Sequence, residues 1–367
     1  MKVGIMSMQR IVNYGSFLQA YGLKKICENL GAQVEFVDYW VKKPIITDDQ
    51  YYRNTWRNID VLYEFYRNYV YEYIRGKKAG TILDKEYSKY LMELGISARK
   101  RFHSKVDLLI VGSDEVFNCT QENPEVGYSP ELFGANRHSQ KLISYAASFG
   151  SVTIEALQQR YGISKEITGY LNDFDEISVR DKNSIDIVDT LIKKKAKYHL
   201  DPVLIYPFAK EIAPKPNIDN YILVYGYINR FSDKKEISAI KKFAEEHGKL
   251  LVSVGYHQEW IDKKIEANPF ELLSYFCYAD YIITDTFHGA VLSIKYSKQF
   301  AVWIRDSNKQ KLGDLLERLN MNSQRIYSPQ CLQEVLEHKI DYDQCQTIIE
   351  KERINSLDYL SRWINRF

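Results

Sequence analysis

The chain has 367 residues, of which 45% are hydrophobic and 27% are charged, and both fractions are those of an ordinary globular protein with a substantial core. Lysine and arginine number 50 against 48 aspartate and glutamate, so the net charge of +2 gives no general electrostatic reason to expect a nucleic-acid partner. The length suggests two domains, and any anion site must arise from a local arrangement of residues.

The five cysteines are scattered along the chain without a Cys-x-x-Cys pair, which is typical of reduced thiols and argues against a zinc site. The sequence therefore predicts no metal. The first residues run directly into a strand-like pattern without a small-residue cleavage site, and no apolar run approaches about 18 residues. We expect a cytoplasmic protein with at most peripheral membrane contact.

The chain opens with a predicted βαβ unit. A strand is expected over 2–8, an amphipathic helix follows with Ser16 as a plausible N-cap, and a second strand is expected over 34–39. The turn before the helix carries Asn13 and Gly15, on the edge where ligands bind in open α/β sheets. This turn lacks the G-x-G-x-x-G spacing and the chain contains no P-loop sequence, which weighs against dehydrogenases and kinases.

A block rich in aromatic residues lies between residues 40 and 75 of this chain, which has 29 tyrosines in all. These aromatic side chains could stack on sugars, or they could be core and dimer contacts of a helical insertion. Contact with a membrane surface is a third interpretation. Replacing Trp56 and Tyr63 with alanine should change either the acceptor preference or the oligomeric state, and the sequence does not choose between these outcomes.

The next segment contains strands that end in polar residues. A helix near 82–101 leads into a buried parallel strand that begins at Val106 and ends in Gly112-Ser113-Asp114, with Asn118 shortly after it. Because parallel strands end at the same edge of a sheet, Asp114 is placed on the predicted ligand edge.

Two strands expected over 142–147 and 176–179 repeat this design, and Arg180 follows the second of them. Its planar guanidinium group is suited to a carboxylate or a phosphate, although a charged residue after a strand is often only a solvated cap. A further strand is expected over 201–205.

Three prolines between residues 206 and 218 indicate a domain junction, and a strand and helix pattern then starts afresh. The expected elements are strands over 221–225, 249–254 (ending at Gly255) and 299–304 (ending at Arg305), and helices over 234–247 and 271–279. The sequence thus predicts two doubly wound Rossmann-like α/β domains, 1–206 and 218–344, that face each other across a cleft. A C-terminal helix over 345–367 is expected to pack near the junction.

The most informative stretch runs from Ala279 to Ile294, where a short apolar run breaks into Asp285-Thr286-Phe287-His288-Gly289 before an apolar-periodic segment. This pattern predicts a strand, a tight turn and the start of a helix, whose N–H groups favour an anion. Thr286 can cap the helix, and Gly289 permits close approach of another group. His288 can bind phosphate or transfer a proton. Alternatively, these residues are ordinary caps and a surface histidine.

Together, these motifs resemble the polysaccharide pyruvyl transferase family, whose members are similar in fold to the two-domain GT-B glycosyltransferases. The resemblance covers most of the chain and is carried by Asn13-Tyr14-Gly15, Leu18-Gln19-Ala20-Tyr21, Gly112 to Asn118, Ser144 to Gly150, Ser178 to Asp181, Asp201-Pro202-Val203, Pro269-Phe270-Glu271 and Thr284 to Gly289. It implies transfer of a pyruvyl group from phosphoenolpyruvate, as co-substrate and without another cofactor, to hydroxyls of a sugar or lipid-linked sugar. Such a reaction belongs to cell-surface or exopolysaccharide synthesis.

The resemblance also implies roles for individual residues. The catalytic candidates are His288, Asp114 and Arg180. The donor-binding candidates are Arg180, Thr286, His288, Gly289, Gly255 and Arg305. The acceptor-binding candidates are Asn13, Gly15, Asp114 and Asn118.

One position departs from the family pattern, because Thr286 stands where well-characterised members resemble one another in having arginine. Two alternatives therefore stay open. One is a GT-B glycosyltransferase that uses a nucleotide sugar, and the other is a saccharide-binding protein without catalytic activity. A homodimer is compatible with each of these functions.

Overall fold

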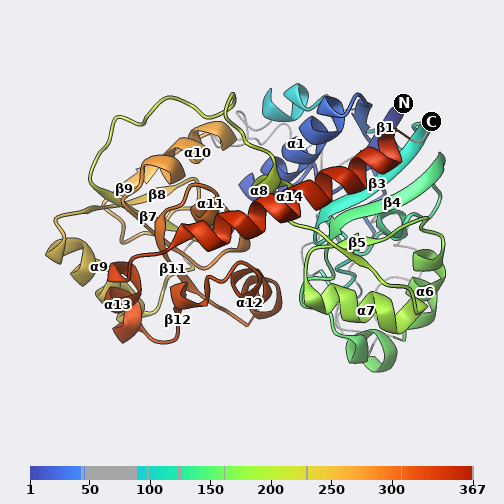
Figure 1. Cartoon of the computed structure of the whole chain (residues 1–367). Helices are drawn as coiled ribbons and strands as arrows, with labels where there is room; N and C mark the ends of the chain where they lie inside the picture. The colour runs from blue at the N-terminus through green and yellow to red at the C-terminus, as the bar shows by residue number, and fades with distance from the viewer. Residues whose placement is uncertain are drawn as a thin grey trace, which may run out of the picture. The chain divides into compact units, whose positions relative to one another are not determined.

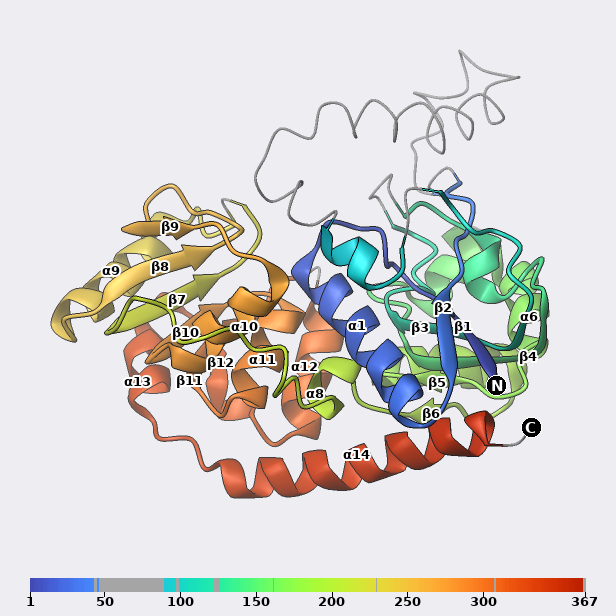
Figure 2. The same cartoon turned by 90° about the horizontal axis from the view of Figure 1, so that it is seen from above.

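The computed structural model describes residues 1–42, 45, 89–96, 99–121, 126–160, 162–228, 230–306 and 308–365. The chain divides into two compact units, which we call unit 1 (Met1–Pro202 and Asn355–Phe367) and unit 2 (Val203–Ile354). Figures 1 and 2 show the helices and strands of both units. Most of the tyrosine-rich block at 40–75, including Trp56 and Tyr63, lies outside the described residues, so its predicted role stays a prediction.

Unit 1 contains a parallel sheet of six strands in the order β2-β1-β3-β4-β5-β6. Its strands are β1 (Lys2–Met6), β2 (Gln33–Phe36), β3 (Val106–Asp114), β4 (Ser139–Ala147), β5 (Ser178–Val179) and β6 (Lys197–Tyr198). Its main helices are α1 (Tyr14–Asn29), α6 (Ser164–Asn172) and α7 (Lys182–Ile192). The expectation of a doubly wound α/β sheet is confirmed here.

The central strand β3 is buried on both faces, as its nearly continuous apolar sequence predicts. Leu109 and Val111 belong to one hydrophobic cluster with side chains of α6 and α7, whereas α1 also packs on this strand. Successive side chains of a strand point to opposite faces, so Leu108 and Ile110 face away from that cluster. Both are fully buried. The sheet is therefore covered on both sides, and polar groups collect where its strands end.

Unit 2 repeats this architecture with a second parallel sheet of six strands in the order β12-β11-β10-β7-β8-β9. Its strands are β7 (Tyr221–Tyr225), β8 (Leu250–Val254), β9 (Lys263–Ile265), β10 (Tyr281–Thr284), β11 (Gln299–Trp303) and β12 (Arg325–Ile326). Its helices are α9 (Lys234–Glu246), α10 (Pro269–Tyr278), α11 (Phe287–Lys295), α12 (Lys309–Arg318) and α13 (Leu332–Glu337). Side chains of α9 and α13 share one cluster with alternate residues of β7, β10 and β11.

The last long helix, α14 (Tyr342–Ile364), belongs to unit 2 over its first part and to unit 1 from Asn355 onward. In unit 1 its buried Tyr359 hydroxyl donates to the carbonyl of Ser144 at 2.9 Å. The indole Nε1 of Trp363 donates to a carboxylate oxygen of Glu176 at 2.7 Å. The last turns of α14 are thereby joined by hydrogen bonds to β4 and to the segment before β5.

Three local expectations are wrong. Residues 202–205 form a one-turn helix, α8 (Pro202–Ile205), instead of a strand, because proline needs no N–H partner in the first turn of a helix. Asn13 caps α1 instead of Ser16, because the amide oxygen of Asn13 accepts from the N–H groups of Gly15 and Ser16 at 2.8 and 3.1 Å. The helix expected to reach residue 101 ends before Gly95, whose φ of 78° leaves the helical region.

Lys295, the last residue of α11, is a largely buried ammonium group in unit 2. Its Nζ donates to the carbonyl of Tyr206 at 2.6 Å and lies 5.4 Å from the ring centroid of Phe208. Burial lowers the pKa of Lys295 to about 8, and Arg353 adds repulsion in the same direction. The folded protein therefore binds this proton less tightly than the unfolded chain, whose lysine has its ordinary pKa near 10.5.

We expect burial of this charged lysine to destabilise the folded protein. The effect should be at its full size below about pH 8 and should become smaller as the pH rises toward 10.5. Lys295→Met should therefore gain stability relative to the wild type at about pH 7, and this advantage should shrink at about pH 9.5. Urea unfolding of both proteins at each pH measures the difference. The two proteins must be compared at each pH because Cys27 also changes the stability with pH. Burial raises the pKa of the Cys27 thiol to about 12, so both proteins lose stability alike as the pH rises. An advantage that does not change with pH would contradict the expectation.

Candidate functional site

In unit 2 the chain runs outward from β7 to β8 and β9 and then returns to β10 on the other side of β7. The loops after β7 and β10 therefore leave the sheet in opposite directions. Open α/β sheets bind ligands in the crevice between two such loops. Gly226 follows β7, and a Cβ atom there would lie 2.9 Å from Oδ1 of Asp285, which follows β10. A glycine at this position allows the two strand ends to approach each other.

The helix α11 begins directly after this strand end. The prediction that Thr286 caps the helix is confirmed, because its Oγ1 accepts from the N–H of Gly289 at 2.9 Å. Gly289 is required by the packing, since a Cβ atom there would lie 2.0 Å from Oγ1 of Thr284. His288 is the second residue of the helix and is half-buried. The first turn of α11 thus presents an imidazole beside the positive end of a helix, which favours an anion.

Two guanidinium groups surround the carboxylate of Asp285. The Nε atoms of Arg230 and Arg305 each lie 3.1 Å from its Oδ2 atom. Arg305 also holds both carboxylate oxygens of Glu236, at 2.6 and 2.7 Å. Burial raises the pKa of Asp285, and the attraction of Arg230 and Arg305 opposes that effect.

Of the predicted donor-binding residues, Arg305 contacts Asp285, which directly precedes Thr286. Gly255 follows β8, which is two strands away from β10 in the sheet. Arg230 and Glu236 were missed by the sequence analysis. The only signal for them is their place after the carboxyl end of β7, in a segment whose charged residues look like those of any solvated helix start.

In unit 1 the corresponding point of reversal lies between β1 and β3. Asn13 caps α1 here, with Gly15 and Ser16 in its first turn. The hydroxyl of Ser16 donates to Oδ2 of Asp114 at 2.8 Å. The acceptor-side candidates Asn13, Gly15 and Asp114 are therefore gathered at the carboxyl ends of the neighbouring strands β1 and β3.

Arg180 connects this point to the far side of the same sheet. Its Nη2 donates to Oδ1 of Asp114 at 3.0 Å and its Nη1 donates to Oδ2 of Asp201 at 2.8 Å. The Arg180 side chain is 2% exposed, and that of Asp201 is 1% exposed. Burial alone would lower the pKa of Arg180, but the charges of Asp114 and Asp201 raise it above its ordinary value. Arg180 is therefore a permanently charged bridge between two carboxylates.

Asn118 is buried, and its Nδ2 donates to Oε2 of Glu115 at 2.9 Å. Gly150 lies against this pair, since a Cβ atom there would be 2.5 Å from Glu115 and 2.7 Å from Asn118. The amide of Asn118 is thus directed at its neighbour Glu115 in the loop that follows β3.

Two solved structures are similar in fold to this chain. The chain is similar to the S. aureus MnaA–UDP co-structure, with 10% identity, a TM-score of 0.54 and coverage of 100% of this chain and 97% of that one. It is also similar to the E. coli trehalose-6-phosphate structure bound with UDP-2-fluoro glucose, with 11% identity, a TM-score of 0.51 and coverage of 99% and 98%. No curated protein matches the chain.

The two parallel six-stranded sheets and the similarity to these structures give the chain a GT-B type fold. The polysaccharide pyruvyl transferase family matches residues 13–307, so the chain belongs to this family. The resemblance seen in the sequence motifs is confirmed, and the family implies a transferase. In the part of the chain that the structure describes, no helix is long and apolar enough to cross a membrane.

Proposed function

We propose that the protein transfers a pyruvyl group from phosphoenolpyruvate to hydroxyls of a saccharide in the synthesis of a cell-surface or extracellular polysaccharide. The observation that carries the proposal is the family match, which spans residues 13–307 and so includes the strand-end loops of both sheets. The reaction needs positive groups for the carboxylate and phosphate, an acid that protonates the methylene carbon, and a base near the acceptor hydroxyl.

We assign binding of the donor to the carboxyl end of β10 in unit 2. The first turn of α11 offers N–H groups and the positive end of a helix, and His288 lies in that turn. His288 then serves as proton donor or phosphate ligand. Arg230 and Arg305 supply positive charge at Asp285, three residues before His288, although the carboxylates of Asp285 and Glu236 offset that charge.

We assign binding of the acceptor to the carboxyl ends of β1 and β3 in unit 1, with Asp114 as the base. The family resemblance implies that Arg180 binds the donor, but its guanidinium is buried and bridges Asp114 and Asp201. We therefore assign it to the acceptor side as a positioning residue that orients the carboxylate of Asp114. Ser16 holds the other oxygen of the same carboxylate.

Titration calorimetry tests the donor. The proposal predicts that the protein binds phosphoenolpyruvate and that phosphate is released when a suitable glycan is added. Transfer from a nucleotide sugar predicts the opposite preference, and uridine diphosphate sugars are the appropriate probes because both structural relatives hold a uridine diphosphate compound. Saccharide binding without phosphate release would indicate a non-catalytic protein.

Thr286→Arg should tighten phosphoenolpyruvate binding. A charged hydrogen bond contributes about 1.5 to 3 kcal/mol, which corresponds to roughly ten- to a hundredfold in affinity. The variant also loses the cap to Gly289, at a cost of about 0.5–2 kcal/mol in stability. Calorimetry and a melting curve measure the two effects separately.

Thr286→Ala is the matched control for this substitution, because it removes the same cap without adding a cation. It should lose stability and gain no affinity. If the arginine variant folds and binds phosphoenolpyruvate no better than the alanine variant, the assignment of the donor to this helix end is wrong.

A further inference from the structure

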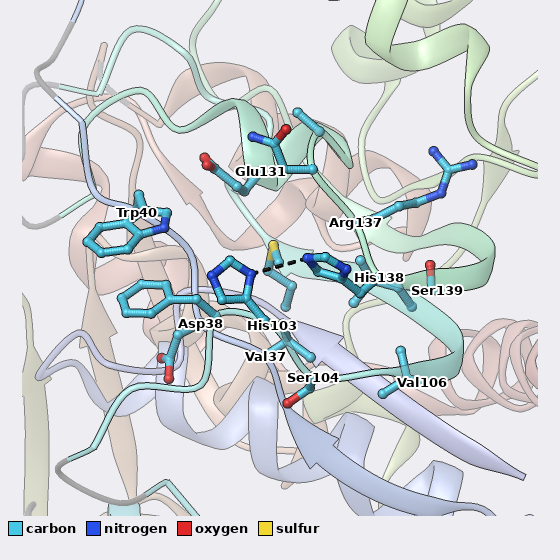
Figure 3. A pocket seen from close by; sticks show the side chains of 15 residues that line it. Val37, Asp38, Trp40, His103, Ser104, Val106, Glu131, Arg137, His138 and Ser139 are labelled. Atoms are coloured by element: carbon cyan, nitrogen blue, oxygen red, sulfur yellow. Dashed lines mark hydrogen bonds between the residues drawn. The ribbon is translucent and has the colours of Figure 1, made fainter.

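A pocket of about 390 Å³ lies in unit 1 (Figure 3), and no residue assigned above to the donor or the acceptor is among the described residues that line it. Met6, Val37 and Leu109 supply apolar side chains from the sheet and the segment after β2. Trp40 and Phe102 stack face to face beside them, with ring centroids 4.0 Å apart. The pocket is therefore built on the core of the unit.

Two histidines line this pocket and point toward each other, as Figure 3 shows. Nδ1 of His103 lies 3.2 Å from Nε2 of His138, and the two rings are nearly perpendicular, at 86°. Two zinc–nitrogen bonds of about 2.0–2.1 Å that meet at about 100–110° place their nitrogen atoms about 3.1–3.4 Å apart. The observed separation is that of a hydrogen bond between the two rings, and it also matches the spacing of two nitrogen atoms bound to one metal ion.

The sheet places the backbone segments of these two exposed histidines side by side. His103 lies three residues before β3, and His138 lies directly before β4, which is the parallel neighbour of β3. The carbonyl of His138 accepts from the N–H of Val106 at 3.2 Å, and Val106 is paired with Ser139 in the register of the two strands. Ligands carried on adjoining strand ends lose little freedom on binding, which favours a metal site.

The charged groups near the pair leave room for a cation. Arg137 lines the pocket but is directed away from the two imidazoles (Figure 3). Asp38 is engaged elsewhere, since its Oδ2 accepts from Arg10 at 2.8 Å and from the N–H of Arg101 at 2.7 Å. Glu131 also lines the pocket, and Figure 3 shows its carboxylate directed away from the two imidazoles. The two imidazoles are therefore the groups of the pocket that face each other at the distance of two metal ligands.

We propose that Nδ1 of His103 and Nε2 of His138 are the protein ligands of a site for a divalent transition metal of the zinc class. Within the described ranges there is no group of three or more histidine, cysteine, aspartate or glutamate residues that would form a closed site. The remaining coordination positions are thus taken by water or by an oxygen atom of a small molecule in the pocket. Zinc sites that bind an exogenous ligand usually have three protein ligands and one open position, so a site with two imidazoles leaves one more position for water or a small molecule.

The test is zinc binding to the full chain, measured by competition with a chromogenic chelator after dialysis against a strong chelator. The wild type should bind one equivalent. His103→Ala and His138→Ala should each weaken binding at least tenfold, because either change removes one of two protein ligands. Cobalt in place of zinc should give a visible absorption band that both substitutions abolish.

His338→Ala is the matched control, because it removes an exposed imidazole of unit 2 and should keep the full equivalent. His138→Gln provides a second, more conservative change of the same ligand and guards against loss of fold. Circular dichroism verifies that each variant is folded. If the wild type binds no more zinc than the His103→Ala/His138→Ala double variant, the two rings form only a hydrogen-bonded pair and the proposal is overturned.

Discussion

His288→Ala is expected to lower pyruvyl transfer from phosphoenolpyruvate by about a hundredfold or more, because a positioned general acid typically supplies 10²- to 10⁴-fold in rate. The melting temperature should change little, since Thr286 and Gly289 make the cap of α11 without the imidazole. Steady-state phosphate release and a thermal melt measure the two properties. The rate loss should remain at saturating phosphoenolpyruvate if His288 transfers the proton.

His257→Ala is the matched control for this prediction. His257 lies near the carboxyl end of β8 in the same sheet, and its Nε2 is 2.7 Å from Oε1 of Glu266. Its removal should leave turnover near that of the wild type. If His288→Ala retains full turnover while it binds phosphoenolpyruvate normally, the imidazole has no part in the reaction and the donor assignment must move elsewhere.

Arg180→Met should destabilise unit 1 by about 3–5 kcal/mol, the usual consequence of removing one partner from a buried ion pair. The carboxylate of Asp201 would lose its cation while its side chain is 1% exposed, and Asp114 would lose the group that fixes one of its oxygens. Urea unfolding gives the size of the loss. Turnover should fall as well, because the carboxylate of Asp114 would be less well oriented.

Arg362→Met supplies the comparison within unit 1. The Arg362 side chain is 43% exposed, with Asp358 at 3.3 Å, and exposed pairs contribute about 0–1 kcal/mol. Adding Asp201→Asn to Arg180→Met should restore part of the lost stability, because it removes the unpaired charge. If Arg180→Met is as stable as Arg362→Met, the buried bridge contributes nothing measurable and its assigned positioning role fails.

Features with a local signal are predictable from the sequence alone. The strand over 221–225 has the predicted bounds, and Thr286 is the predicted cap of the following helix after β10. Both depend on a few consecutive residues, whose apolar content and side-chain reach are visible without the fold. The one-turn helix at 202–205 was missed for the same reason, since a short apolar run after a proline suits either a strand or a helix.

By itself, the sequence determined the class of this protein, because repeated apolar runs that end in Gly, Ser, Asp and Arg are readable in order and match one family. It also determined the position of His288 in the first turn of a helix, which depends only on neighbouring residues. Only the tertiary structure decided which charges meet. Arg180 lies 66 residues from Asp114, and Arg305 lies 69 from Glu236. His103 and His138 are 35 residues apart. Such pairs depend on the order of strands in the sheet, and a strand's own residues do not specify its neighbours.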